Sequence, residues 1–309
     1  MKLFKPNFWD KNKISFFSIL LFPISLIIKL IILFDKILTK TNKSPIPVIC
    51  VGNIYLGGTG KTPLCAEIFS ILKNINKNPA FIRKEYKSFH DEVSFQKKIG
   101  SIYQNKKRIN AINNAIQNKN DIVILDDGFQ DFSIKKDLSI ICFNEKQWIG
   151  NGFTIPSGPL REGLSSLNRA NFVIINGNKN IDIENKILKF NQSIKIFYIK
   201  YEPQNIDEFK NKKVISFAGI GNPDNFFDLL KKNNIDILEQ ISFPDHYNYT
   251  NNELEDLIKK SRENNVILIT TEKDYLRIGQ NYKDDIKYLK IKVQIENKNQ
   301  FIEELKKFI

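Results

Sequence analysis

A glycine-rich segment at residues 48–64, VICVGNIYLGGTGKTPL, carries the strongest chemical signal in the chain. An apolar run precedes it and a helical pattern follows it, a context in which backbone N–H groups surround phosphates. Lys61 can reach the β- and γ-phosphates of a nucleotide, and the Thr62 hydroxyl can ligate Mg²⁺. Because Tyr55 stands where the P-loop pattern has glycine, we predict a variant nucleotide loop. Its expected members are Tyr55, Leu56, Gly57, Gly58, Thr59, Gly60, Lys61 and Thr62.

A second signal is an apolar run that ends in two carboxylates, DIVILDDGFQ at residues 121–130. Asp126 and Asp127 match the acidic element with which P-loop enzymes hold Mg²⁺ directly or through water. The alternative is structural, since carboxylates at the end of a strand also cap a following helix or turn. Together with the glycine-rich loop, the pair favours a site for a nucleotide and Mg²⁺.

The composition limits the partners of the chain. Of its 309 residues 42% are hydrophobic, enough for a substantial core, and the formal net charge is +13. Such a charge attracts nucleotides, phosphorylated lipids or anionic membranes, although ordinary solvated lysines explain it equally well. No nucleic-acid-binding module is recognisable, so we expect no nucleic acid as a partner, and no obligate protein partner is evident. The scattered cysteines and only two histidines argue against a dedicated zinc site.

The N-terminus holds an almost wholly apolar stretch from Ile14 to Phe34, interrupted by Pro23 and Lys29. About 20 residues cross the hydrocarbon core of a bilayer, so the stretch is long enough to span. A helix that lies in the membrane interface, with Lys29 reaching the surface, is a second interpretation, and a buried core helix is a third. Basic residues flank both ends, so the sequence does not orient the segment.

Beyond this segment, apolar runs alternate with helical patterns, which is typical of an α/β fold with a mostly parallel sheet covered on both faces. We predict a P-loop NTPase-like domain, a second, smaller α/β domain and an N-terminal membrane helix. The expected boundaries are 1–35 for the anchor, 36–205 for the P-loop domain and 206–309 for the smaller domain. In the last of these, the run Ile286–Val293 is predicted to be one strand.

Further motifs follow GGTGKTP and DDGFQ in a fixed order: IPSGPLRE at 155–162, AGIGNPDNFF at 218–227, FPDHYNY at 243–249 and TEKD at 271–274. In this order, and with the hydrophobic N-terminus, the chain resembles the tetraacyldisaccharide 4'-kinases of lipid A assembly over nearly its whole length. The resemblance implies transfer of the γ-phosphate of ATP, with Mg²⁺, to the 4'-hydroxyl of an acylated glucosamine disaccharide 1-phosphate. It also implies two α/β domains with the active site in the cleft between them.

The resemblance implies roles for individual residues. Glu162 matches a family residue near the metal and the nucleotide, and Arg161 beside it can either steady phosphate charge or form a surface salt bridge. His246 in FPDH matches the family's functional histidine, with capping of the helix near Asn251 as the alternative. Lys61 and Asp127 are expected to act in catalysis. The expected metal ligands are Thr62, Asp126, Asp127 and Glu162.

The carboxylate that would work with His246 lies in FIRKEYKSFHDEVS, residues 81–94. The family carries Ser-Arg-Gly-Tyr-Gly, a longer loop and then Gly-Asp-Glu-Pro; Arg83 echoes the first part, whereas the glycines and the proline are absent here. Asp91 is the preferred carboxylate and Glu92 is the alternative. Such a pair can orient a sugar hydroxyl and take its proton as the phosphoryl group arrives.

Two other functions share these motifs. A membrane-tethered GTPase switch needs an Asn-Lys-x-Asp pattern, and the nearest candidate, Asn-Lys-Asn-Ile at 178–181, fails at its last position. A kinase or ATPase of the same fold that acts on another acceptor is the remaining alternative, and the membrane segment argues against a soluble acceptor. Since ATP is available in the cytoplasm, we expect the catalytic domains on the cytoplasmic face of the inner membrane, in contact with its lipid.

Overall fold

The computed structural model describes residues 5–10, 14–85 and 90–309, and the side chains of His90 and Asp91 lie outside the described part. The chain divides into two compact units. The larger contains residues 5–86, 99–200 and 294–309, and the smaller contains residues 201–293 together with the segment that ends at Lys98. The domain division at residue 205 stays a prediction, and in the structure the last residues return to the larger unit.

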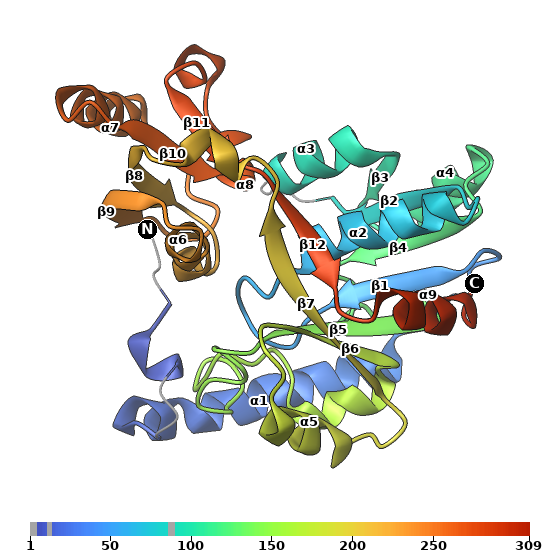
Figure 1. Cartoon of the computed structure of the whole chain (residues 1–309). Helices are drawn as coiled ribbons and strands as arrows, with labels where there is room; N and C mark the ends of the chain where they lie inside the picture. Colours follow the sequence, from blue (N-terminus) through green and yellow to red (C-terminus); the bar gives the residue numbers. More distant parts are fainter. Residues whose placement is uncertain (1–4, 11–13, 86–89) are drawn as a thin grey trace. The chain divides into compact units, whose positions relative to one another are not determined.

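The larger unit is built on an eight-stranded sheet with the strand order β12-β7-β6-β5-β1-β4-β2-β3 (Figure 1). Most of its neighbouring strands pair in parallel, as expected from the alternating sequence pattern. Its strands are β1 (Val48–Gly52), β2 (Pro79–Lys84), β3 (Ile102–Asn105), β4 (Ile122–Asp126), β5 (Leu138–Asn144), β6 (Phe172–Asn176), β7 (Lys195–Pro203) and β12 (Ile291–Ile295).

Helices cover both faces of this sheet. Successive side chains of a strand point to opposite faces, and in β1 Val48 and Cys50 join one apolar cluster with residues of the helices α4 and α5. Aromatic contacts attach α2 and α9 to the sheet, because Phe69 stacks on Phe81 and Phe301 meets Phe172 edge to face. These helices are α2 (Lys61–Asn74), α4 (Arg108–Gln117), α5 (Ile181–Leu188) and α9 (Lys298–Lys306).

The smaller unit has a four-stranded parallel sheet in the order β11-β10-β8-β9. Its strands are β8 (Lys213–Ala218), β9 (Asp236–Ser242), β10 (Ile267–Thr271) and β11 (Ile286–Leu289), and its helices are α3 (His90–Ile99), α6 (Pro223–Lys232), α7 (Asn251–Glu263) and α8 (Glu272–Tyr275).

The predicted single strand Ile286–Val293 is wrong. It divides at Lys290 into β11, which pairs in the smaller sheet, and β12, which joins the edge of the larger sheet. The apolar pattern continues through Lys290, so the sequence carries no sign that the chain changes sheets there.

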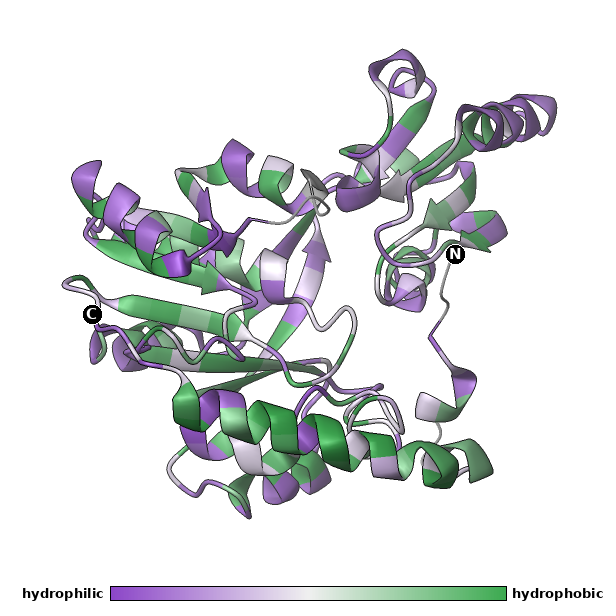
Figure 2. Cartoon of the chain, turned by 180° about the vertical axis from the view of Figure 1, so that it is seen from behind, coloured by the Kyte–Doolittle hydropathy of each residue, from purple (hydrophilic) through white to green (hydrophobic). Residues whose placement is uncertain are grey.

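The N-terminal helix α1 (Phe16–Leu38) belongs to the larger unit. Its buried side chains are the polar Ser18 and Ser25, whereas most of its apolar side chains are exposed. In Figure 2 most of the helix ribbon has the green colour of hydrophobic residues. Among the described residues it is the one helix long and apolar enough to cross a membrane, and only 11% of its most apolar window is buried. The alternative of a buried core helix is therefore wrong.

Candidate active site

The nucleotide loop connects β1 to α2 in the larger unit. Gly57 and Gly60 have φ angles of 134° and 91°, which residues with a Cβ rarely adopt. The Asn53 amide braces the loop from inside by donating to the Gly57 carbonyl at 3.3 Å and to the Thr59 hydroxyl at 3.0 Å. Because α2 begins directly at Lys61, its unpaired N–H groups and its positive dipole end face the space that the loop surrounds, as in phosphate-binding loops.

Tyr55, the departure from the P-loop pattern, is fully buried. It forms a β-bridge to Leu160, its hydroxyl donates to Asp10 at 2.5 Å, and the Lys5 ammonium lies 4.5 Å from the ring centre. Burial, together with the nearby Asp10, raises the pKa of the Tyr55 hydroxyl, which stays a neutral donor. The tyrosine therefore joins the start of the loop to the segment that precedes α1.

Asp126 ends β4, which lies beside β1 in the sheet with Val51 opposite Asp126. The adjacent parallel strands bring this carboxylate to the edge from which the nucleotide loop leaves. Asp126 Oδ2 accepts a hydrogen bond from the Thr62 hydroxyl at 3.2 Å and one from Arg83 Nη1 at 2.6 Å. The Arg83 and Asp126 side chains are 8% and 1% exposed, so this is a buried ion pair.

Asp127 has a φ angle of 57°, in the left-handed region that residues other than glycine rarely occupy. Arg161 Nη1 donates to both of its carboxylate oxygens, at 2.9 and 3.0 Å, and Lys61 Nζ lies 3.7 Å from Oδ1. Arg108 donates to its backbone carbonyl at 2.9 Å. The Asp127 carboxylate thus lies next to two cationic side chains at the nucleotide loop, and Arg161 forms its ion pair with this residue of the expected site.

Glu162 forms two hydrogen bonds with Arg169, each of 2.9 Å, and accepts one from Gln130 at 3.1 Å. No three histidine, cysteine or acidic side chains in the described ranges gather as a metal site. Mg²⁺ normally keeps several waters and phosphate oxygens and takes only one or two carboxylates from a protein. The oxygen donors Thr62 and Asp126, in contact beside the phosphate loop, fit such an ion.

His246 lies in the smaller unit, on the loop between β9 and α7. Its φ angle is 55°, and its backbone N–H donates to the Gly219 carbonyl at 3.0 Å. The rings of Tyr247 and Tyr249 pack against each other and against Phe243, with centroids between 4.9 and 5.3 Å apart. The helix α7 is capped by Thr250 in a capping box with Glu253, so His246 is not the N-cap and the loop presents it separately.

A buried ion pair holds the turn opposite this loop. Asp274 is fully buried and accepts hydrogen bonds from the Gly219 N–H, the Tyr249 hydroxyl and Arg277, at 3.1, 2.8 and 2.6 Å. A Cβ on Gly219 would lie 3.0 Å from the Tyr249 hydroxyl and 3.2 Å from Asp274, so a larger residue would crowd these groups. The motifs AGIG, FPDHYNY and TEKD therefore interlock around His246.

The segment with the expected catalytic carboxylate also belongs to the smaller unit. Glu92 Oε1 lies 3.9 Å from His246 Nε2 and accepts a hydrogen bond from Lys273 at 2.5 Å. The backbone of Asp91 lies in the first turn of α3, but its side chain is outside the described part of the chain. The structure thus brings Glu92 and His246 together, and the preference for Asp91 stays a prediction.

The sequence model of a known family, LpxK, described as tetraacyldisaccharide-1-P 4'-kinase, matches residues 17–99 and 95–309. A tetraacyldisaccharide 4'-kinase of Pelagibacter ubique is 44% identical and covers 99% of this chain and 98% of its own. A tetraacyldisaccharide 4'-kinase of Rickettsia bellii is 34% identical and also covers 99% of this chain and 98% of its own. The chain belongs to the tetraacyldisaccharide 4'-kinase family. Among solved structures, LpxK from Aquifex aeolicus in complex with ATP has a TM-score of 0.73 at 26% identity and covers 94% of this chain and 99% of its own.

Membership of the tetraacyldisaccharide 4'-kinase family confirms the resemblance, the P-loop-like α/β fold and the enzyme class that the motifs predicted. Sequence reasoning did not find several residues that the structure places at these kinase motifs. Arg83 was noted only as an echo of a family segment, while Lys273 and Arg277 carried no assignment. Asp10 gave no signal because its partner Tyr55 is remote in the sequence.

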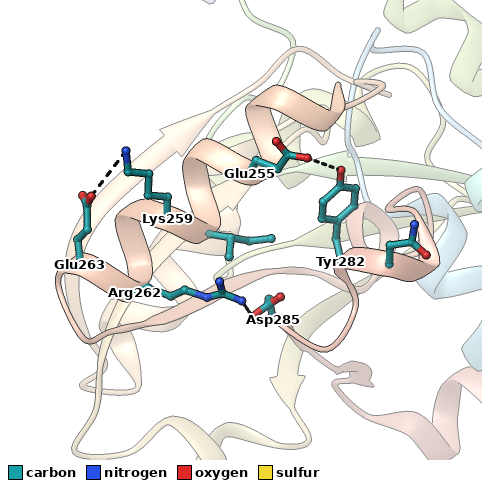
Figure 3. A pocket seen from close by; sticks show the side chains of 8 residues that line it. Glu255, Lys259, Arg262, Glu263, Tyr282 and Asp285 are labelled. Carbon is teal, nitrogen blue, oxygen red and sulfur yellow. Dashed lines mark hydrogen bonds and ion pairs between the residues drawn. The ribbon is translucent and has the colours of Figure 1, made fainter.

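A separate pocket of about 390 Å³ lies on the smaller unit between α7 and the turn at Tyr282 (Figure 3). Ion pairs line it, among them Arg262 with Asp285 at 2.7 Å. Its lining, Glu255, Ile258, Lys259, Arg262, Glu263, Asn281, Tyr282 and Asp285, includes none of the expected site residues. Charged side chains that already pair with each other do not indicate a substrate site, so we give this pocket no catalytic role.

Proposed function

We propose that this chain transfers the γ-phosphate of ATP to the 4'-hydroxyl of a tetraacyldisaccharide 1-phosphate in lipid A assembly, using the residues described above. The observation that carries the proposal is the meeting of the nucleotide loop with Asp126 and Asp127 at the ends of two adjacent parallel strands. Membership of the tetraacyldisaccharide 4'-kinase family supports the proposal that this constellation is the nucleotide site.

The nucleotide loop, residues 55–62, would hold the phosphates of ATP. Lys61 and Arg161, which both contact Asp127, would supply positive charge that stabilises the negative charge on the γ-phosphate in the transition state. Mg²⁺, when bound, offsets phosphate charge; Thr62 and Asp126 would hold it, with Asp127 and Glu162 as the further ligands that the sequence suggests.

The sugar hydroxyl needs a base. We assign this task to His246 with Asp91, because a histidine near a carboxylate can accept a proton at neutral pH and stay oriented. The fixed backbone of His246, bonded to Gly219 and set in an aromatic loop, supports the assignment. A preorganised base lowers the cost of aligning the hydroxyl with the γ-phosphate for in-line transfer.

The helix α1 would lie on the bilayer and not cross it. Before the helix, the Asn151 N–H donates to the Trp9 carbonyl at 2.8 Å; within it, Ser25 bonds Ser157 at 2.8 Å; after it, the Asn42 N–H donates to the Ser133 carbonyl at 2.8 Å. A spanning helix separates its ends by about 30 Å of hydrocarbon, whereas both flanks here are attached to one folded unit. Its exposed apolar side chains then enter the interface, with the kinase on the cytoplasmic side of the inner membrane, where ATP and the lipid substrate meet.

A comparison of His246→Ala with wild type tests the assignment of the base. The measurement is single-turnover phosphorylation of the lipid in detergent micelles, together with the Kd for ATP. We expect the rate of transfer to fall about 100-fold or more, while the Kd for ATP stays within about twofold of wild type. A near-normal transfer rate in the variant would remove His246 from the mechanism.

A further inference from the structure

The TEKD turn reaches α3 at two points within the smaller unit. Lys273 donates to Glu92 Oε1 at 2.5 Å, and Glu272 Oε1 lies 3.8 Å from Lys98 Nζ. The first pair is the more enclosed: the side chains of Lys273 and Glu92 are 25% and 14% exposed, against 50% for Lys98. At 1.5 Å per residue, the two attachment points on α3 lie about 9 Å apart along the helix, enough to fix its direction as well as its position.

The helix α3 buries few apolar side chains among its described residues. Within residues 92–99 the one fully buried side chain is that of Gln96, which is polar. Helices are usually held in place by a buried apolar face, and this one has little of it. The ion pairs to the TEKD turn therefore help to keep α3 in place.

The turn that carries Lys273 is itself rigid. The Thr271 hydroxyl accepts from the Asp274 N–H at 3.1 Å, and Asp274 is bound by Arg277 at 2.6 Å in the network that also shapes the His246 loop. Lys273 thus belongs to the same turn whose hydrogen bonds around Asp274 position the His246 loop. Its contact with Glu92 attaches the start of α3 to this turn.

The contacts of Glu92 favour a structural role for its carboxylate. Its Oε1 is bonded to Lys273 at 2.5 Å and stays 3.9 Å from His246, so the ammonium is its closer partner.

We propose that Lys273 is a positioning residue: it clasps Glu92 and thereby holds the first turn of α3, with Asp91 in it, at a fixed place beside His246. The proposal rests on the proposed function, since it gives Asp91 and His246 a joint task, and it assigns to the lysine of TEKD a role in that task. Glu92 then acts as the anchor of the turn and not as the base.

Kinetics of the full chain in micelles test the clasp. Lys273→Met and Glu92→Gln should each lower kcat for lipid phosphorylation about 10- to 100-fold, with the KM for ATP within about twofold of wild type. Because both changes remove one interaction, the double variant should be no slower than the slower single variant. Lys273→Arg, which keeps the charge, should recover a rate within about threefold of wild type. Lys260→Met, which breaks an ion pair with Glu239 in the same unit, is the matched control and should leave kcat unchanged.

Hydrogen exchange of the α3 amides supplies a readout that does not depend on the acceptor. In the full chain, Lys273→Met should speed exchange in residues 92–99 about tenfold, whereas Lys260→Met should not. The clasp would be overturned if the rate losses of the two single variants multiplied in the double variant, or if hydrogen exchange in α3 did not change. It would also be overturned if Lys273→Met raised only the KM for the lipid, a result that would make Lys273 a ligand of the lipid phosphate. Absence of lipid phosphorylation by wild type would overturn the proposed function instead, and the exchange result would still decide the clasp.

Discussion

The buried pair of Arg83 and Asp126 leads to a quantitative prediction for Arg83→Met. Arg83 Nη1 lies 2.6 Å from Asp126 Oδ2, and both side chains are at most 8% exposed. Removing one partner of such a pair leaves a buried charge without its counterion, which costs about 3–5 kcal/mol. The substitution keeps an unbranched side chain of similar length, so lost packing adds little to the cost.

An exposed ion pair in the same unit supplies the control. Lys200 Nζ lies 3.0 Å from Glu296 Oε1, but these side chains are 51% and 42% exposed, and such pairs contribute about 0–1 kcal/mol. Lys200→Met should therefore cost several-fold less than Arg83→Met, although each substitution removes the cation of an ion pair. The difference isolates burial as the cause.

Urea unfolding in micelles, followed by tryptophan fluorescence, measures both costs. The chain has two tryptophans, Trp9 and Trp148, and both lie in the larger unit with the two ion pairs. Arg83→Met combined with Asp126→Asn should be more stable than Arg83→Met alone, because the uncompensated charge is gone. A cost of Arg83→Met within about 1 kcal/mol of Lys200→Met, or no recovery in the double variant, would refute the reasoning.

Three further predictions use the same unit. Tyr55→Phe should cost about 1 kcal/mol in urea unfolding, because the lost hydrogen bond ends on the half-exposed Asp10; no measurable change would mean that this bond does not anchor the loop. Burial alone would raise the pKa of Asp131, but hydrogen bonds from Ser133 and Arg108 outweigh it and lower that pKa. Its contribution to stability is thus complete above the unfolded pKa of about 3.9 and is lost as the pH falls through the lower folded pKa. In Asp131→Asn, the free energy of unfolding should fall less steeply as the pH drops below about 4. The same pH dependence as in wild type would contradict this. Leu30→Glu, on the exposed face of α1, should reduce co-sedimentation with anionic vesicles by about tenfold or more, and full retention would argue against an interfacial helix.

Part of the fold could be predicted because several parallel strands, such as β1, β4 and β5, are nearly continuous apolar runs. The strands β6 (Phe172–Asn176) and β8 (Lys213–Ala218) are of the same apolar kind. The helix α3 was not predicted, since HDEVSFQKKI has no apolar stripe and depends on ion pairs with a turn far along the chain. Such a helix has no local signature.

The nucleotide loop could be read from sequence because its chemistry is local: glycines, Lys61 and Thr62 stand side by side. The partners of the two aspartates could not be read, since Arg83 lies 43 residues from Asp126 and Arg161 lies 34 residues from Asp127. Only the pairing of parallel strands and the return of the 155–162 segment bring them together. The choice between Asp91 and Glu92 is of the same kind, because it depends on Lys273, which is 181 residues from Glu92.

The central claim is that the nucleotide loop transfers phosphate from ATP to the lipid. Transfer of radiolabelled γ-phosphate from ATP to tetraacyldisaccharide 1-phosphate, in detergent micelles with Mg²⁺, tests it most directly when wild type is compared with Lys61→Ala. The account predicts a labelled bisphosphorylated lipid with wild type and none with the variant. No transfer by a wild-type protein that binds ATP, or a near-normal rate in Lys61→Ala, would contradict it.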